Sequence, residues 1–192
     1  LAQIAAEAQG FRFKDIHVVY GDTDTSLFDI GSHACRSVTV IGSAVVDAAK
    51  KVRARVCDIA AKRMSEDGYK VDADQLDVCD GIVSVIDDPS ITISVADIAH
   101  DEIYNYTDKG GHICEMGSYL SDSHNPNFQA SFVEIEVDTE TGNLRVVKYV
   151  VAHDIGRAIN PQGVEGQLEG GAVQGMGFAL TEDFVLGEDG SV

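Results

Sequence analysis

The feature that most constrains the fold is a long amphipathic stretch, GSAVVDAAKKVRARVCDIAAKRM, at residues 42–64. Its apolar residues recur at helical spacing: Val45, Ala48, Ala49, Val52, Val56, Ile59 and Ala60. This spacing predicts a helix of about six turns with one apolar face. Such a helix must bury that face, so we expect a sheet or further helices against it.

Shorter elements surround this helix in the first half of the chain. LAQIAAEA has helical composition and ends at Gly10, a natural helix stop, and IHVVY at residues 16–20 predicts a short buried strand. Within residues 66–95, GIVSVI and ITISV predict two small strands with a turn at Pro89. VADIAHDEIYNY predicts a further helix, and residues 105–127 are typical of a loop.

The second half of the chain has a clearer pattern. ASFVEIEVDTETGNLRVVKYVVAHD predicts a β-hairpin, because Asp138 and Gly142 suit a tight turn. Asn160-Pro161 then opens a glycine-rich helix, PQGVEGQLEGGAVQGMGFALTED. The predicted fold class is α+β, with hairpins, short strands and packed helices. The chain is expected to form one fragment over residues 1–192, and a two-lobed division into 1–105 and 106–192 is an alternative.

Composition excludes several function classes. The formal net charge of −18 would repel nucleic acid and acidic membrane surfaces, and the basic residues gather in one helical stretch that suits a solvated face. The four cysteines include no C-x-x-C, so the sequence predicts neither a zinc ribbon nor an iron–sulfur cluster. Without a leader or an apolar run of about 18 residues, the expected location is the cytoplasm.

The segment FDIGSHACRS, residues 28–37, carries residue types that suit three different sites. A calcium loop would start at Asp22, but its sixth position is Leu27 and its twelfth is His33, which excludes an EF-hand. A cysteine nucleophile would be Cys35, and His33 would point away from it on an extended segment. A histidine from elsewhere, such as His153, could serve as the base, so this alternative stays open.

The third interpretation is a loop that binds an anion at the start of the long helix. We expect that helix to begin near Gly42, and its free N–H groups, with the Ser32 and Ser37 hydroxyls, could hold an anionic ligand. A plain helix-capping loop is the alternative.

The glycine-rich helix suggests a second half of such a site. Each of its glycines costs roughly 1 kcal/mol of helix stability relative to alanine, which points to a close approach by another group. Gln167 and Gln174 lie seven residues apart and therefore project from one face. An amide both donates and accepts, which suits the edge of a heterocycle such as a pterin. Helix packing through small residues is the alternative.

Together these stretches resemble the molybdenum-cofactor-binding subunit of the molybdenum hydroxylases, the family of xanthine dehydrogenase, aldehyde oxidase and 4-hydroxybenzoyl-CoA reductase. The resemblance covers IHVVYGDTDTSLFDIGSHACRS through GSAVVDAA and the hairpin with the GQLEGGAVQGMG helix, and it is loose over residues 57–127. It implies cofactor contacts, largely from the backbone, at Ser32, His33, Ala34, Cys35 and Ser37. It also implies a hydrogen bond from Gln174, with Gln167 the weaker candidate.

The resemblance further implies a molybdenum–pterin cofactor, in some members a cytosine dinucleotide, and an oxidoreductase that hydroxylates or reductively dehydroxylates an aromatic heterocycle, aldehyde or aryl-CoA. Iron–sulfur clusters and FAD are expected on partner subunits or domains, beside the remainder of the molybdenum subunit. The family's catalytic base lies in a G-x-G-E segment that Glu182 and Glu188 do not match. We therefore expect no catalytic residue, no protein ligand to the metal and no activity from this chain alone. A non-catalytic interaction module is the alternative function.

Overall fold

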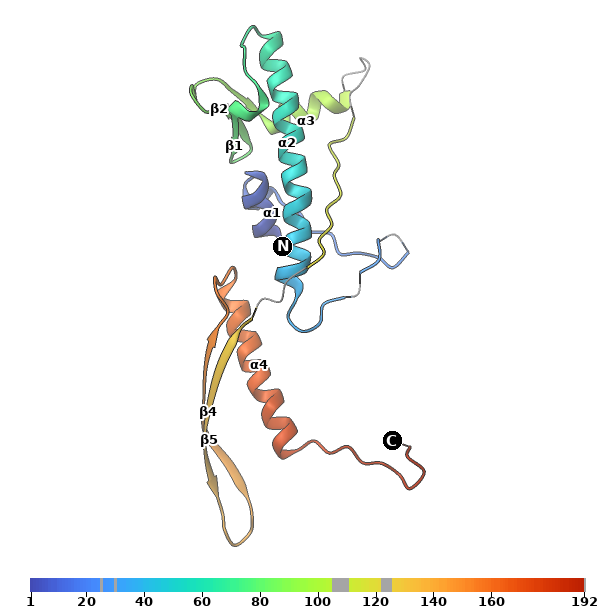
Figure 1. Ribbon diagram of the computed structural model, residues 1–192, viewed down its shortest axis with the longest axis vertical. Helices are drawn as coiled ribbons and strands as arrows, with labels where there is room; N and C mark the ends of the chain where they lie inside the picture. The colour runs from blue at the N-terminus through green and yellow to red at the C-terminus, as the bar shows by residue number, and fades with distance from the viewer. Residues whose placement is uncertain (25, 30, 105–110, 122–125, 192) are drawn as a thin grey trace. The chain divides into compact units, whose positions relative to one another are not determined.

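The computed structural model describes residues 1–192 apart from 25, 30, 105–110, 122–125 and 192. The chain divides into two compact units, Leu1–Asp122 and Ser123–Val192 (Figure 1). The lobe boundary expected between residues 105 and 106 falls outside the described residues, so the two-lobed division stays a prediction.

The first unit is built on the long helix that the sequence predicts, α2 (Gly42–Glu66). A π-helical turn, η2 (Ser37–Ile41), precedes it without a break, so helical backbone begins at Ser37 and not near Gly42. The C-terminal half of α2 carries the core residues Val56, Cys57, Ala60, Ala61 and Met64. The apolar face predicted from the spacing is therefore buried mainly in that half.

A small antiparallel sheet in the order β1-β2-β3 packs with this half of α2. The strands are β1 (Leu76–Cys79), β2 (Ile82–Val85) and β3 (Thr92–Ser94), with the short helix η3 (Ala73–Gln75) before them and α3 (Val95–Tyr104) after them. Ile98 of α3 and Val83 of β2 are fully buried in this core. The sequence predicted two strands and α3; it missed β1, whose four residues are too few to show alternation.

The predicted N-terminal helix is confirmed as α1 (Ala2–Gln9), which ends at Gly10 in the left-handed conformation. Gly10 O accepts a hydrogen bond of 3.0 Å from Gly81 N in the β1–β2 turn. The turn η1 (Phe13–Asp15) follows. The strand predicted at residues 16–20 is wrong: these residues form no strand, and all but Ile16 are exposed. Their apolar pattern has no partner strand within the described residues.

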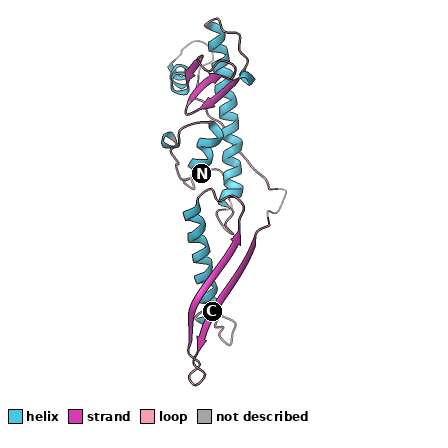
Figure 2. Ribbon diagram, turned by 90° about the vertical axis from the view of Figure 1, so that its left-hand side faces the viewer, coloured by secondary structure: helices cyan, strands magenta, loops and turns pink. Residues whose placement is uncertain are grey.

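The second unit contains the predicted hairpin and glycine-rich helix. β4 (Phe128–Val137) pairs antiparallel with β5 (Leu144–Asp154), with a register shift between Glu134 and Ile135. Asp138 shapes the turn, because its carboxylate accepts hydrogen bonds from Glu140 N, Thr141 N and Thr141 Oγ1. α4 (Pro161–Leu180) lies along the hairpin in both ribbon views (Figures 1 and 2).

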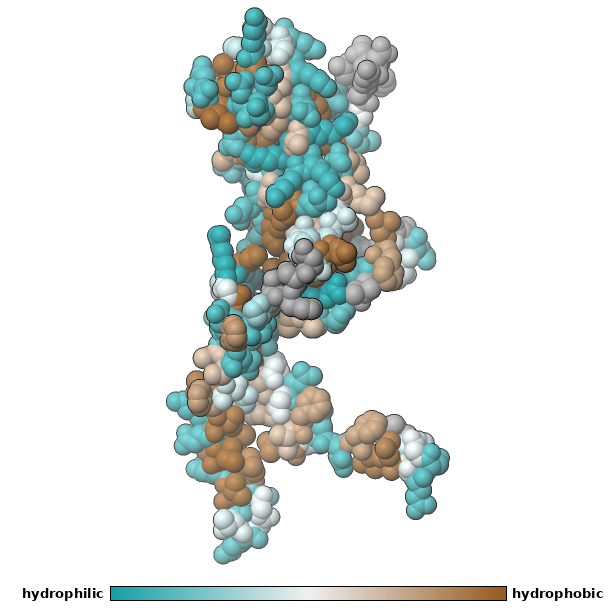
Figure 3. All heavy atoms as spheres, viewed as in Figure 1, coloured by the Kyte–Doolittle hydropathy of each residue, from teal (hydrophilic) through white to brown (hydrophobic). Residues whose placement is uncertain are grey.

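None of the described residues in this second unit is buried. Large apolar side chains stay exposed along both strands, among them Phe128, Phe132, Ile135, Val147 and Val150. Figure 3 shows hydrophobic residues gathered over the hairpin. A face of this kind is typical of a sheet that other protein surface covers.

Candidate functional site

The segment that precedes α2 holds an unusual backbone conformation. Gly31, Ala34 and Cys35 have φ of 87°, 50° and 55°, all in the left-handed region. Two consecutive non-glycine residues there cost about 1–2 kcal/mol each. Backbone strain of this kind is concentrated at binding and catalytic sites. This conformation is compatible with the binding loop predicted from the sequence, and the plain helix-capping loop stays the alternative.

The polar contacts of the loop fold it back on the first turn of the helix. Ser32 Oγ lies 2.6 Å from Ser37 Oγ, so the structure brings these two predicted residues together. Gly31 N donates to Asp29 Oδ1 over 2.6 Å, and Arg36 N donates to His33 O over 3.2 Å. Ser32, His33, Ala34 and Cys35 are exposed, and Ser37 is half-buried.

The start of this helix lacks a side-chain cap. The residue at its N-cap is Arg36, which makes no side-chain capping bond. Arg36 Nε is also buried, and it has no hydrogen-bond partner among the described residues. Uncapped N–H groups and an orphaned guanidinium donor suit an anionic group at the helix start. Sequence reasoning missed Arg36, since nothing in the spacing distinguishes it from a solvated arginine.

Helix α4 begins as predicted, with Asn160 Oδ1 accepting from Gly163 N over 3.3 Å and Pro161 in the first turn. Gln167 and Gln174 are exposed and lie on one face two turns apart. Among the described atoms, nothing lies within 4 Å of a Cβ built on Gly166, Gly170, Gly171 or Gly175. All other described helices belong to the first unit, so packing of a helix on these glycines stays an open alternative.

The other readings of the loop gain nothing from the structure. Asp22 Oδ1 accepts from Asp24 N over 2.9 Å, a turn contact, and the described residues include no group of three or more His, Cys, Asp or Glu that could hold a metal. His153 Nδ1 lies 3.0 Å from Gln129 Oε1 on the hairpin. The cysteine nucleophile stays an untested alternative.

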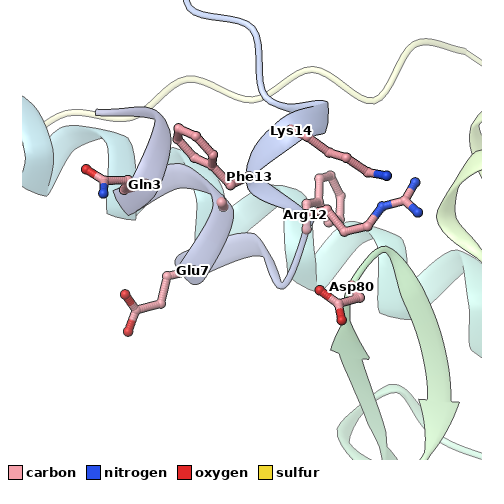
Figure 4. Close-up of a pocket in the computed structure, with 8 residues that line it drawn as sticks. Gln3, Glu7, Arg12, Phe13, Lys14 and Asp80 are labelled. Carbon is pink, nitrogen blue, oxygen red and sulfur yellow. The ribbon is translucent and has the colours of Figure 1, made fainter.

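An open pocket lies elsewhere, between α1, η1 and the β1–β2 turn (Figure 4). Arg12 and Lys14 approach it together with Glu7 and Asp80, and none of the predicted site residues lines it. Its charges are mixed, and Arg12 Nε already pairs with Asp15 over 2.6 Å. This pocket therefore contains none of the predicted candidates, and the loop and the glutamine face of α4, one in each unit, stay predictions.

A family model described as the molybdopterin cofactor-binding domain matches residues 1–192. The chain belongs to the molybdopterin cofactor-binding domain family. The predicted resemblance and the molybdenum–pterin cofactor are thereby confirmed for the family. Among curated relatives, the gamma subunit of the 6-hydroxypseudooxynicotine dehydrogenase complex of Paenarthrobacter nicotinovorans is 31% identical over 99% of this chain. The nicotine 6-hydroxylase large subunit of the same organism is 30% identical over all of it.

Solved structures of this family share the fold. Reconstituted CO dehydrogenase from Oligotropha carboxidovorans matches with a TM-score of 0.81 and 26% identity over 99% of this chain. Quinoline 2-oxidoreductase from Pseudomonas putida 86 matches with a TM-score of 0.79 and 26% identity over 100% of the chain. Both likenesses confirm the α+β class as part of a molybdenum-binding domain.

The molybdopterin cofactor-binding domain seen here is a small part of each relative. The chain spans about a quarter of their length: 24% of the gamma subunit and 23% of the CO dehydrogenase chain. Among the described residues, no helix is both long and apolar enough to cross a membrane.

Proposed function

We propose that this chain is part of the molybdopterin-binding subunit of an oxidoreductase. The reaction class is hydroxylation of an aromatic heterocycle, aldehyde or aryl-CoA with water as the oxygen source, or the reverse reaction, a reductive dehydroxylation that releases water. The observation that carries the proposal is the strained loop Gly31–Arg36, which leads into an uncapped helix start. The full-length match to the family and the hydroxylase and dehydrogenase names of the relatives support it.

The loop would hold the anionic part of the cofactor. Backbone groups of Ser32, His33, Ala34, Cys35 and Ser37 would contact the pterin and its phosphate, and the helix dipole would favour the negative charge. Arg36 would add its orphaned donor. In a chain with a formal net charge of −18, fixed dipoles and one guanidinium are an economical way to bind an anion.

Helix α4 would hold the edge of the pterin. The open glycine positions let a flat ring approach the helix backbone, and the amides of Gln174 and, more weakly, Gln167 would hydrogen-bond it. The bound cofactor would supply the redox chemistry. These residues would bind and orient it and would neither donate nor accept a proton in the reaction.

The apolar hairpin supports a partner as well. The exposed phenylalanines and aliphatic residues of β4 and β5 would be covered by the remainder of the molybdenum subunit.

Iron–sulfur and flavin subunits or domains would carry electrons to an acceptor, in the cytoplasm. Glu182 and Glu188 do not match the family's base motif, so we propose that these 192 residues alone are inactive. The comparisons do not favour an interaction module without catalysis.

Two matched variants of the complete subunit test the loop. Gly31 and Gly142 both have positive φ, and each has open space where a Cβ would stand. Gly31→Val and Gly142→Val therefore impose similar backbone strain, about 1–2 kcal/mol, at different places. We expect Gly31→Val to lower the pterin content of the purified subunit severalfold and Gly142→Val to leave it unchanged. Equal pterin content in both variants would overturn the assignment of the loop.

A further inference from the structure

A segment that the sequence marks only as loop lies along α2. We call Gly111–Ser121 the strap; it runs beside the N-terminal half of the helix (Figure 1). Lys51 Nζ donates to Met116 O over 3.0 Å, and Asp47 Oδ2 accepts from Ser118 N over 3.1 Å. Lys51 Nζ and Asp47 Oδ2 also pair directly at 2.7 Å. One ion pair on α2 thus holds the strap backbone at two points.

Gly117, between these two points, lies directly against the helix. A Cβ built there would stand 2.0 Å from Ala44 O and 2.6 Å from Ala48 N, distances that no side chain tolerates. The small side chains of Ala44 and Ala48 leave room for the strap backbone. This close contact and the two hydrogen bonds fix the strap in one position against α2.

The contact with the strap is important for the N-terminal half of α2, because few residues in this half are buried. Between residues 37 and 55 only Gly42 and Ala49 are buried, whereas the other half of the helix carries the core. The first turn is π-helical, a geometry less favourable than the α-helix. α1 supports one side, with Ile4 Cδ1 2.9 Å from a Cβ built on Gly42. The strap supports the face that carries Asp47 and Lys51.

We propose that Asp47 and Lys51 are positioning residues: by fastening the strap they order the N-terminal half of α2, and with it the loop Gly31–Arg36. The inference rests on the proposed function, because the loop is the part that would bind the cofactor. The hydrogen bonds and the ion pair described for Asp47 and Lys51 go to each other and to the strap, so their effect on the loop passes through the helix.

The test uses the complete subunit, first without cofactor. In Asp47→Asn and in Lys51→Met, amide exchange over residues 37–48 should rise on the order of tenfold, since local opening no longer breaks the charged contacts. The pterin content of the subunit isolated with cofactor should fall severalfold. Lys51→Arg keeps a cation in reach of Asp47, so its amide exchange and pterin content should match those of the wild type. Gly117→Ala, which forces the strap off Ala44, should act like Asp47→Asn.

Asp58 and Lys62 provide the matched control, because they too lie four residues apart and exposed on α2, in its other half. Asp58→Asn and Lys62→Met should change neither readout. Unchanged exchange in Asp47→Asn would overturn the inference. Faster exchange with full pterin content, while Gly31→Val lowers it, would overturn the positioning role and leave the proposed function standing. Full pterin content in both Gly31→Val and Asp47→Asn would overturn the proposed function and this inference together.

Discussion

At the scale of single residues, the left-handed conformation of Ala34 and Cys35 suggests how to distinguish two roles: a loop that binds the cofactor through its backbone, and a loop that carries a nucleophilic cysteine. Cys35 has a positive φ, a backbone conformation that glycine adopts without strain. If the loop binds the cofactor through its backbone N–H groups, the complete enzyme does not need the Cys35 thiol for turnover. If Cys35 is a nucleophile, turnover requires the thiol.

We therefore predict that Cys35→Gly in the complete enzyme retains most of its turnover, because glycine adopts the positive φ without strain and keeps the backbone N–H group. Cys35→Val should lower stability and pterin content, since a β-branched residue is a severe outlier at positive φ. Turnover, pterin content and thermal midpoint of both variants check this. Loss of all turnover in Cys35→Gly with full pterin content would instead establish the nucleophile.

Some features of single residues could be predicted from the sequence, and others could not. The shared face of Gln167 and Gln174 follows from helical spacing, because a helix repeats every 3.6 residues whatever its surroundings. The conformation of Ala34 and the burial of Arg36 Nε do not, since strain and desolvation at one residue depend on tertiary contacts.

At the scale of elements, α4 carries more glycine than helix stability favours. We predict that Gly171→Leu in the complete subunit lowers pterin content severalfold by filling the face that the ring would approach. Val173→Leu adds bulk two residues along, on another face, and should leave pterin content unchanged. Pterin released on denaturation is the measurement. If Gly171→Leu retains its pterin, no cofactor lies against this face.

The junction of α2 and α3 gives a pH dependence. Arg63, and next His100, lower the pKa of Asp101 below its ordinary value of 3.8. A carboxyl with a lowered folded pKa stabilises the fold above its unfolded pKa, and the contribution disappears as pH falls through the folded value. Asp101→Asn should therefore destabilise the subunit at pH 7 and destabilise it less at pH 3, below the ordinary value of 3.8. Urea unfolding of both proteins at the two pH values checks this; an equal difference at both would contradict it.

Elements with strong local patterns were predictable, and those that need a partner were not. α2, α4 and the β4–β5 hairpin follow from periodicity and turn chemistry. IHVVY has the pattern of a strand, yet forms none within the described residues, because a strand exists only when another pairs with it. The strap could not be foreseen, since its hydrogen bonds join residues more than 60 positions apart.

At the scale of the whole molecule, the exposed hairpin predicts how the chain behaves by itself. We expect the 192-residue chain alone to self-associate or to bind a hydrophobic dye, because its apolar strands lack cover. It should carry no stoichiometric molybdenum and no turnover. Elemental analysis and light scattering of the purified chain measure this. A monomer with a full complement of metal that oxidises a purine or aldehyde would contradict it.

The central claim is that the loop before α2 and the glutamine face of α4 hold the pterin. The most direct test is the pterin and molybdenum content of the complete subunit with Gln174→Ala. The matched control is Gln162→Ala, an exposed glutamine about 120° away around the same helix. A buried polar atom of the cofactor left without its partner costs about 1–3 kcal/mol, so Gln174→Ala should lower the affinity for the cofactor roughly five- to 150-fold, and with it the occupancy under limiting cofactor. Gln167→Ala should do less, and Gln162→Ala nothing. Wild-type content in Gln174→Ala would show that α4 does not bind the cofactor.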